Sequence, residues 1–150
     1  MLKSKIIKLL RPHDSEELYL VLKKWYRNSD VPNVRLIFEL GVAAFNTKHY
    51  DEARDVFRRL DRLTLGLRDR YEEREVVLDE SGNPQDFEGK VTWIKDDYNG
   101  DIACFTLKIG YPLYFRPIAS PFTVTRNELV MFNIAFSYRG PRAVNIRKSR

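Results

Sequence analysis

The spacing of apolar residues changes once along this chain, and this change limits the possible folds more than any other feature. Before Leu67, apolar residues recur at the three- and four-residue intervals of amphipathic helices. After Glu75, they occur in short runs separated by glycine, proline and asparagine, which is typical of strands joined by turns. We therefore expect an α+β protein, with a helical segment over residues 1–70 and a small β-barrel over residues 71–150.

The helical segment is expected to contain about three amphipathic helices. The first follows a capping-box signature formed by Asp14 and Glu17. The second follows Asn33, a residue type that caps helix N-termini. The third runs from about Tyr50 through Leu63, with apolar residues on one side and charged residues on the other.

The second part is expected to form a hairpin strand followed by five barrel strands. The expected strands cover residues 75–78, 87–94, 101–109, 113–118, 129–136 and 143–147, with a turn over residues 79–84. We expect Val91, Leu113 and Phe115 to face inward. Strand alternation then places Trp93 and Tyr114 outward, with a core position as the alternative for Trp93. Phe122 is a further candidate for the core, and for Phe132 a core position is favoured.

The positive charge of the chain lies in its second part. Of 26 basic and 21 acidic residues, ten basic and five acidic ones follow Asp86, so the first part holds 16 of each sign. Residues 139–150 contain five cations and no anion. This asymmetry favours an anionic partner for the second part, with a basic tail that aids solubility as the alternative.

Several functional classes find no support in the sequence. The longest uncharged apolar stretch, around residues 42–45, is far shorter than the roughly 18 residues of a membrane span, and no secretory signal is present. The single cysteine, Cys104, fits a reducing cytoplasm. His13, His49 and Cys104 do not have the spacing of metal ligands. We expect a cytoplasmic protein without catalytic or metal sites, cofactors, membrane contact or a small-molecule ligand.

Two motifs mark the ends of the expected barrel. The first is Gly89-Lys90-Val91-Thr92-Trp93. The second combines Val130-x-Phe132 with Arg139-Gly140-Pro141-x-Ala143-x-Asn145-Ile146. Together they resemble the first strand and the last two strands of cold-shock domains, which are five-stranded OB-fold barrels that bind single-stranded nucleic acid. The resemblance covers residues 89–147.

This resemblance implies a set of nucleic-acid-binding residues. Leu113-Tyr114-Phe115-Arg116 is similar to the family's third-strand motif, in which an aromatic and a basic residue face the nucleic acid. The implied site residues are Lys90, Trp93, Tyr98, Tyr114, Arg116, Tyr138, Arg139 and Arg142. The second strand departs from the family, because Asn99 and Asp101 stand where two aromatic residues are usual. An acid there would repel phosphate, whereas Tyr98, or Phe136 with Tyr138, could supply replacement rings.

The helical segment resembles one tetratricopeptide repeat over Val34–Leu67. Leu40-Gly41, Phe45, Tyr50, Ala53 and Phe57 follow the order and spacing of that family. The resemblance implies that Gly41 lets two helices approach and that Ala53 lies at their contact. One repeat cannot bury its own faces, so the segment is either a helical cap of the barrel or the end of a longer solenoid.

Two functions remain open. The first is a non-enzymatic protein that binds single-stranded RNA or DNA through the barrel and a protein partner through the helices. The second is a protein-interaction or sensor module, the C-terminal part of a larger helical-repeat signalling protein, whose barrel has lost nucleic-acid binding. The sequence does not distinguish RNA from DNA and identifies neither the protein partner nor the oligomeric state.

Overall fold

The computed structural model of the protein contains two compact units. One holds the residues up to Glu72 together with Tyr138–Gly140, and the other holds Glu73–Ser137 and Pro141–Arg150. The described residues are 16–29, 33–63, 66 and 72–149.

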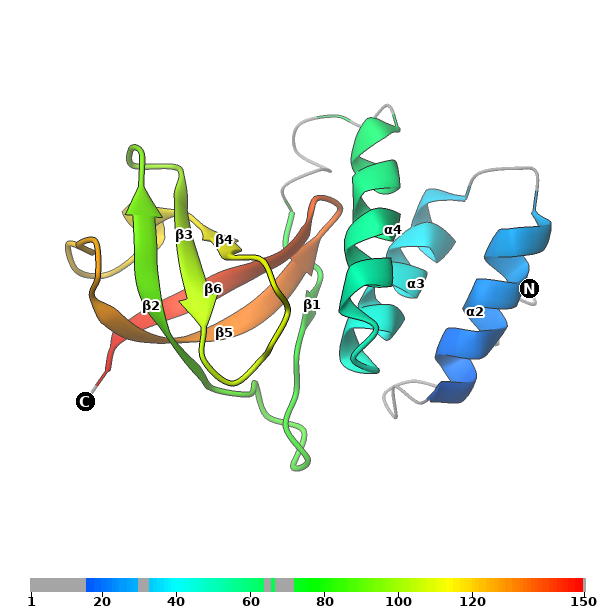
Figure 1. The fold of residues 1–150 in the computed structure, drawn as a ribbon, viewed down its shortest axis with the longest axis horizontal. Coiled ribbons are helices and arrows are strands. Elements are labelled where there is room, and N and C mark those ends of the chain that lie inside the picture. The colour runs from blue at the N-terminus through cyan, green and yellow to red at the C-terminus, as the bar shows by residue number, and fades with distance from the viewer. Residues whose placement is uncertain (1–15, 30–32, 64–65, 67–71, 150) are drawn as a thin grey trace. The chain divides into compact units, whose positions relative to one another are not determined.

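Three helices form most of the first unit, as the apolar spacing predicts. They are α2 (Glu16–Asn28), α3 (Val34–Asn46) and α4 (Tyr50–Arg62) (Figure 1). The expected cap of α3 is confirmed, because Asn33 Oδ1 accepts a hydrogen bond of 3.1 Å from the backbone N–H of Leu36. The capping box expected at Asp14 lies outside the described residues.

The central helix of this unit is α3, which contacts both α2 and α4. Phe38, Leu40 and Ala44 on α3 are fully buried. A Cβ atom on Gly41 would lie 2.7 Å from Phe57 Cζ, so a side chain at this position would clash with α4. Ala53 of α4 is also fully buried. The expectation that Gly41 allows two helices to approach is confirmed.

A closed β-barrel with one additional strand forms the second unit. The strands are β1 (Glu75–Val76), β2 (Phe87–Ile94), β3 (Gly100–Cys104), β4 (Leu113–Phe115), β5 (Leu129–Ser137) and β6 (Gly140–Lys148). The barrel order is β5-β2-β3-β4-β6, and pairing of β5 with β6 closes it. The β4–β6 pair is parallel and the other pairs in the order are antiparallel. This mixed barrel is compatible with an OB-fold and confirms the predicted α+β class.

Apolar side chains from the barrel strands form its core. Side chains with no exposed surface are Val91, Ile102, Leu113, Phe115, Val130, Phe132, Ile134 and Phe136. Burial of each such side chain stabilises the fold by about 1.5 to 3 kcal/mol before conformational entropy is counted. The inward positions expected for Val91, Leu113 and Phe115 are confirmed, as is the core position of Phe132. Phe122 is only partly buried.

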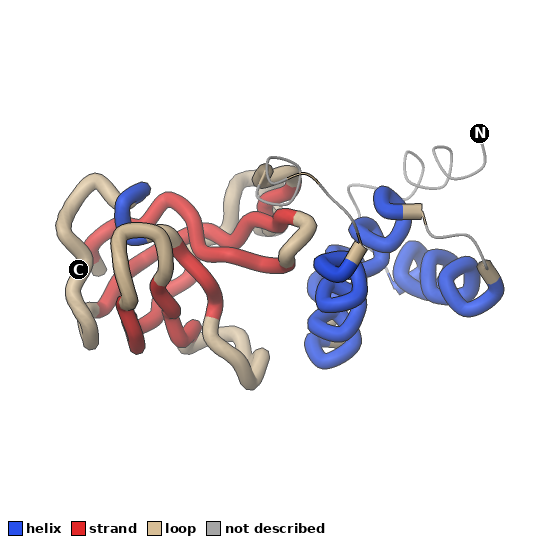
Figure 2. The backbone as a smooth tube through the Cα atoms, turned by 90° about the horizontal axis from the view of Figure 1, so that it is seen from above, coloured by secondary structure: helices blue, strands red, loops and turns tan. Residues whose placement is uncertain are grey.

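Two strands are shorter than the sequence pattern indicates. β3 ends at Cys104 rather than near residue 109, and β4 ends at Phe115, before the 3-10 helix η1 (Pro117–Ala119). Figure 2 shows η1 in blue among the red strands. Pro112 lacks the N–H that would continue the β3–β4 ladder beyond Leu113, and Pro117 lacks the one that would extend β4 at its other end.

The strand β1 pairs with β5 rather than with β2. Glu75 lies opposite Phe136 and Val76 opposite Ala135. The expected hairpin between β1 and β2 is reduced to a single bridge between Leu78 and Pro84. Pro84 has no N–H to donate, which limits pairing there.

The first glycine of the β2 motif is required by a close approach of two strands. A Cβ atom on Gly89 would lie 2.3 Å from the backbone oxygen of Ala103 on β3. No larger residue fits this position without moving the backbone. The glycine therefore helps to set the spacing of the two strands that carry Trp93 and Asp101.

Candidate nucleic-acid interface

Four residues on neighbouring strands form one row across the outside of the barrel. Trp93 of β2 pairs with Asp101 of β3, and Asp101 pairs with Tyr114 of β4. Tyr114 in turn pairs with Arg142 of β6. Paired residues on adjacent strands point to the same side of a sheet. Because Leu113, next to Tyr114, is fully buried inside the barrel, this row faces outward.

A β-bulge gives Trp93 its outward position. Val91 pairs with Ile102, but Trp93 pairs with Asp101, so Thr92 is an extra residue in β2. Strict alternation would place Trp93 on the same inward side as Val91. The expectation that Trp93 faces outward is met, since 45% of it is exposed, but the reason given by alternation was wrong.

The β2–β3 turn places Tyr98 beside this row. Asp96 Oδ1 accepts a hydrogen bond of 2.8 Å from the backbone N–H of Tyr98, which shapes the turn. This bond, together with those from Asn99, lowers the pKa of Asp96 more than burial raises it, so the pKa lies below its ordinary value. Tyr114 Oη donates a hydrogen bond of 2.7 Å to the backbone oxygen of Tyr98. Tyr98 is 53% exposed.

Two arginines lie over the tyrosine rings. Arg116 Cζ lies 5.4 Å from the ring centroid of Tyr98, and Arg142 Cζ lies 4.9 Å from that of Tyr114. Both distances are typical of cation–π contacts. We call the surface formed by Trp93, Tyr98, Tyr114, Arg116 and Arg142 the ring face. It brings together five of the eight residues that the cold-shock resemblance implies.

One acidic residue lies within the ring face. Asp101 stands between Trp93 and Tyr114 in the row, where the sequence comparison expects an aromatic residue. Burial raises the pKa of its carboxyl group above the ordinary value. An ionised Asp101 would oppose a phosphate group on this surface, so the electrostatics of the face are mixed.

The other three implied residues lie elsewhere. Lys90 is exposed on β2, opposite Ala103. Tyr138 and Arg139 belong to the helical unit. The Tyr138 ring packs edge-on against Phe38 with the centroids 5.1 Å apart, and Arg139 Nε lies 3.4 Å from Asp61 Oδ1.

A ring cluster of Phe136 and Tyr138 does not form at the β5–β6 turn. Phe136 has no exposed surface and packs inside the barrel. Tyr138 packs against α3 instead. Of the three rings considered as replacements, Tyr98 is the one that lies beside the row.

The basic C-terminal stretch is partly neutralised by acids from distant parts of the chain. Arg147 Nη2 donates a hydrogen bond of 2.8 Å to Asp86 Oδ1. This bond, followed by one from Asn133, holds the pKa of Asp86 below its ordinary value. Arg142 Nε lies 3.9 Å from Glu73 Oε1. The cations that the sequence counts as one basic cluster thus have individual acidic partners.

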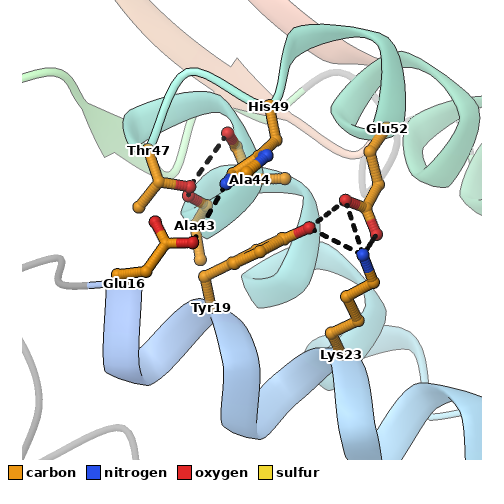
Figure 3. A network of polar contacts seen from close by, with 8 residues as sticks. All are labelled: Glu16, Tyr19, Lys23, Ala43, Ala44, Thr47, His49 and Glu52. Carbon is orange, nitrogen blue, oxygen red and sulfur yellow. Dashed lines mark hydrogen bonds and ion pairs between the residues drawn. The ribbon is translucent and has the colours of Figure 1, made fainter.

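A polar cluster in the helical unit was not predicted from the sequence. Figure 3 shows the Tyr19 ring of α2 stacked on His49, with the ring centroids 4.2 Å apart and the planes at 11°. The Tyr19 hydroxyl donates to the Glu52 carboxylate, and Lys23 Nζ donates to Tyr19 Oη over 3.0 Å. His49 Nε2 lies 3.1 Å from Glu16 Oε1. The i, i+4 spacing of Tyr19 and Lys23 is the only local sign of this cluster.

This cluster joins α2 to α4 and to the turn before it. Burial, followed by the hydrogen bond to Glu52, raises the pKa of Tyr19. The hydrogen bond with Tyr19 is the main cause of a raised pKa for Lys23. Both shifts keep Tyr19 neutral and Lys23 charged at neutral pH, which suits a structural contact between helices.

The part of the chain that the structure describes contains neither a metal-binding group nor a membrane-spanning helix. Its His, Cys, Asp and Glu residues form no group of three that could hold a metal ion. Cys104 is a free thiol. Among the described helices, none combines the length and apolar character needed to cross a membrane.

Comparison with known proteins identifies no relative. No protein-family model matches this chain, no curated protein is significantly similar to it, and no solved structure matches it.

Proposed function

We propose that this chain is a non-enzymatic, cytoplasmic protein whose barrel binds single-stranded RNA or DNA on the ring face. The observation that carries the proposal is the grouping of three aromatic rings and two arginines on one side of the barrel, where Arg116 is exposed and Arg142 is almost fully buried. Trp93 and Tyr98 are about half exposed, and Arg116 and Arg142 lie over tyrosine rings.

The physical basis is base stacking combined with phosphate attraction. Stacking of a base on an aromatic side chain contributes about 1 to 3 kcal/mol and tolerates any base. Arginine adds a cation that contacts phosphate through a planar set of donors. A surface with both features binds single strands with little sequence preference and with a marked dependence on salt.

The motifs at both ends of the barrel support a cold-shock-like protein. Gly89–Trp93 lies in β2, and Arg139–Ile146 forms the end of the β5–β6 turn and most of β6. In OB-folds, the second and third strands and the adjoining loops bind nucleic acid. Here these elements are β3, β4 and the β2–β3 turn that carries Tyr98.

For the helical unit we propose docking of a protein partner. The tight contact of Gly41 with Phe57 and the buried Ala53 support a tetratricopeptide-like helix pair. Repeats of this class usually stack on neighbours and bind proteins on an extended surface.

Asp101 favours a second candidate function. A carboxylate between Trp93 and Tyr114 attracts a basic group of a protein partner and repels the phosphates of a nucleic acid. Under this alternative the barrel is a protein-interaction or sensor module, and the exposed rings bind a protein surface.

Replacing Trp93 tests the proposal. Fluorescence anisotropy of labelled single-stranded RNA and DNA of mixed sequence, at two salt concentrations, should show saturable and salt-sensitive binding. The variant Trp93→Ala should bind about tenfold more weakly, because one stacking platform is lost.

Phe105→Ala is the matched control, because Phe105 is an aromatic residue of similar exposure, 50%, outside the ring face. It should bind like the unmodified protein. An equal loss in both variants, or no binding at low salt, would rule out the ring face as a nucleic-acid site and favour the protein-interaction module.

A further inference from the structure

A hollow of 450 Å³ lies in the barrel unit between β6 and the segment that follows β4. Three cationic side chains line it, namely Arg116, Arg142 and Arg147, and Ala119 and Ile146 contribute apolar wall. We propose that this hollow binds a phosphate group of the strand that stacks on the ring face. This inference rests on the proposed function. It places the bases of the strand on the ring face and one of its backbone phosphates in the hollow.

The hollow is continuous with the ring face. Arg142 lines the hollow and also lies over the ring of Tyr114, at 4.9 Å. Arg116 lines it and lies over Tyr98, at 5.4 Å. A base stacked on Tyr114 therefore brings its own backbone close to these two guanidinium groups. Phosphate contacts of this kind fix the position of a strand without reading its sequence.

Two of the three arginines are held in place before any ligand binds. Arg147 Nη2 donates to Asp86, and Arg147 Nε donates over 3.1 Å to the backbone oxygen of Asn145. Arg142 is 4% exposed. Because little side-chain freedom is left to lose, binding of an anion in the hollow costs little conformational entropy.

The charge of the hollow suits a phosphate group, because three cations outnumber the two acids beside them. Two acids are near the cations: Glu73 lines the hollow, and Asp86 bonds to Arg147. The distance of 3.9 Å between Glu73 Oε1 and Arg142 Nε exceeds that of a hydrogen bond. A phosphate in the hollow would form charge-assisted bonds with the arginines that line it.

Titration with inorganic phosphate tests the hollow directly. Amide NMR spectra of the full chain, recorded at constant ionic strength against chloride, should show saturable shifts along residues 142–147. Arg116→Gln should weaken this binding about tenfold, because it removes a charged donor from the hollow. Arg126→Gln is the matched control, since Arg126 is exposed and does not line the hollow. Non-saturable shifts, or equal responses of the two variants, would overturn the proposal.

Oligonucleotide binding then separates this inference from the proposed function. With single strands, Arg116→Gln should lower affinity about tenfold and reduce the slope of log K against log salt by about 0.7, whereas Arg126→Gln should change neither. Strand binding with equal effects of the two variants would reject the subsite and leave the function standing. Saturable phosphate binding without strand binding would support the subsite and reject nucleic acid as its source of phosphate.

Discussion

Asp101 places a carboxylate in the middle of the row that runs from Trp93 to Arg142. Burial raises its pKa, so it takes up a proton at higher pH than an ordinary aspartate. A proton on Asp101 removes the negative charge that opposes phosphate. The ring face should therefore become a better surface for nucleic acid as the pH falls.

Asp101→Asn should strengthen binding of single strands about fivefold at neutral pH, as expected for removal of one like charge at about 4 Å in water. The affinity of the unmodified protein should rise as pH falls from about 7 to about 4, and that of the variant should stay flat. Because the folded-state pKa is raised, the ionised form is disfavoured in the folded protein, so the variant should also be more stable at neutral pH. Anisotropy and thermal melts across this pH range measure both effects.

Glu80→Gln is the control, because it removes one negative charge from an exposed turn residue. It should leave the pH dependence of binding unchanged. A pH dependence that persists in Asp101→Asn would mean that another group controls binding.

For Trp93, the exposure of the side chain could be predicted from the sequence, but its structural cause could not. Its identity as an exposed ring was predicted from the motif around it, and the exposure is observed. Alternation from Val91, however, points it inward, and only the extra residue Thr92 turns it outward. The position of a bulge depends on the pairing register of β2 with β3. The residue types in β2 alone do not determine this register.

At the scale of elements, one buried amide joins three segments of the barrel. Asn133 of β5 is 5% exposed. Its Nδ2 donates to the backbone oxygen of Gln85 over 2.8 Å and to Asp86 Oδ1 over 3.0 Å. Its Oδ1 accepts a bond of 3.1 Å from Asn145 Nδ2 on β6. This side chain therefore holds the start of β2 and the end of β6 against β5.

Asn133→Ala should lower the free energy of unfolding by about 1 to 3 kcal/mol, because three hydrogen bonds of a buried group are lost together. Urea unfolding followed by circular dichroism measures the change. Asn99→Ala, which removes an exposed amide bonded to Asp96, should cost no more than about 0.5 kcal/mol. Equal losses in the two variants would show that the Asn133 network adds nothing to stability.

Elements with local signals were predicted well, and their ends less well. The helix caps and apolar periodicity around Asn33 and Tyr50 are local, and α3 and α4 begin where expected. β3 ends at Cys104, and Pro112 interrupts its pairing with β4 there, so the length of this pairing depends on a different strand. The β1 strand pairs with β5, which is distant in sequence, so local sequence signals could not predict this pairing.

At the scale of the whole molecule, the net charge of +5 overestimates the number of cations that are available to bind phosphate. Arg147 bonds to Asp86, Arg139 pairs with Asp61, and Arg142 lies near Glu73. These acids come from far earlier in the sequence, so counting charges along the C-terminal stretch could not reveal them. Arg116 lies in the ring face and should contribute more to binding than Arg139, which is exposed but paired with Asp61 in the helical unit.

Tyr138 was predicted to stack on bases, but its ring packs against Phe38 in the helical unit. Tyr138→Ala should therefore lower the free energy of unfolding by about 1 to 2 kcal/mol through loss of an aromatic contact. Its affinity for single strands should change less than about twofold, whereas Tyr114→Ala should bind about tenfold more weakly. Chemical unfolding measures the first effect, and anisotropy below the melting temperature of both variants measures the second. If Tyr138→Ala lost as much affinity as Tyr114→Ala, the strand would have to contact the β5–β6 turn, and the binding surface would extend beyond the ring face.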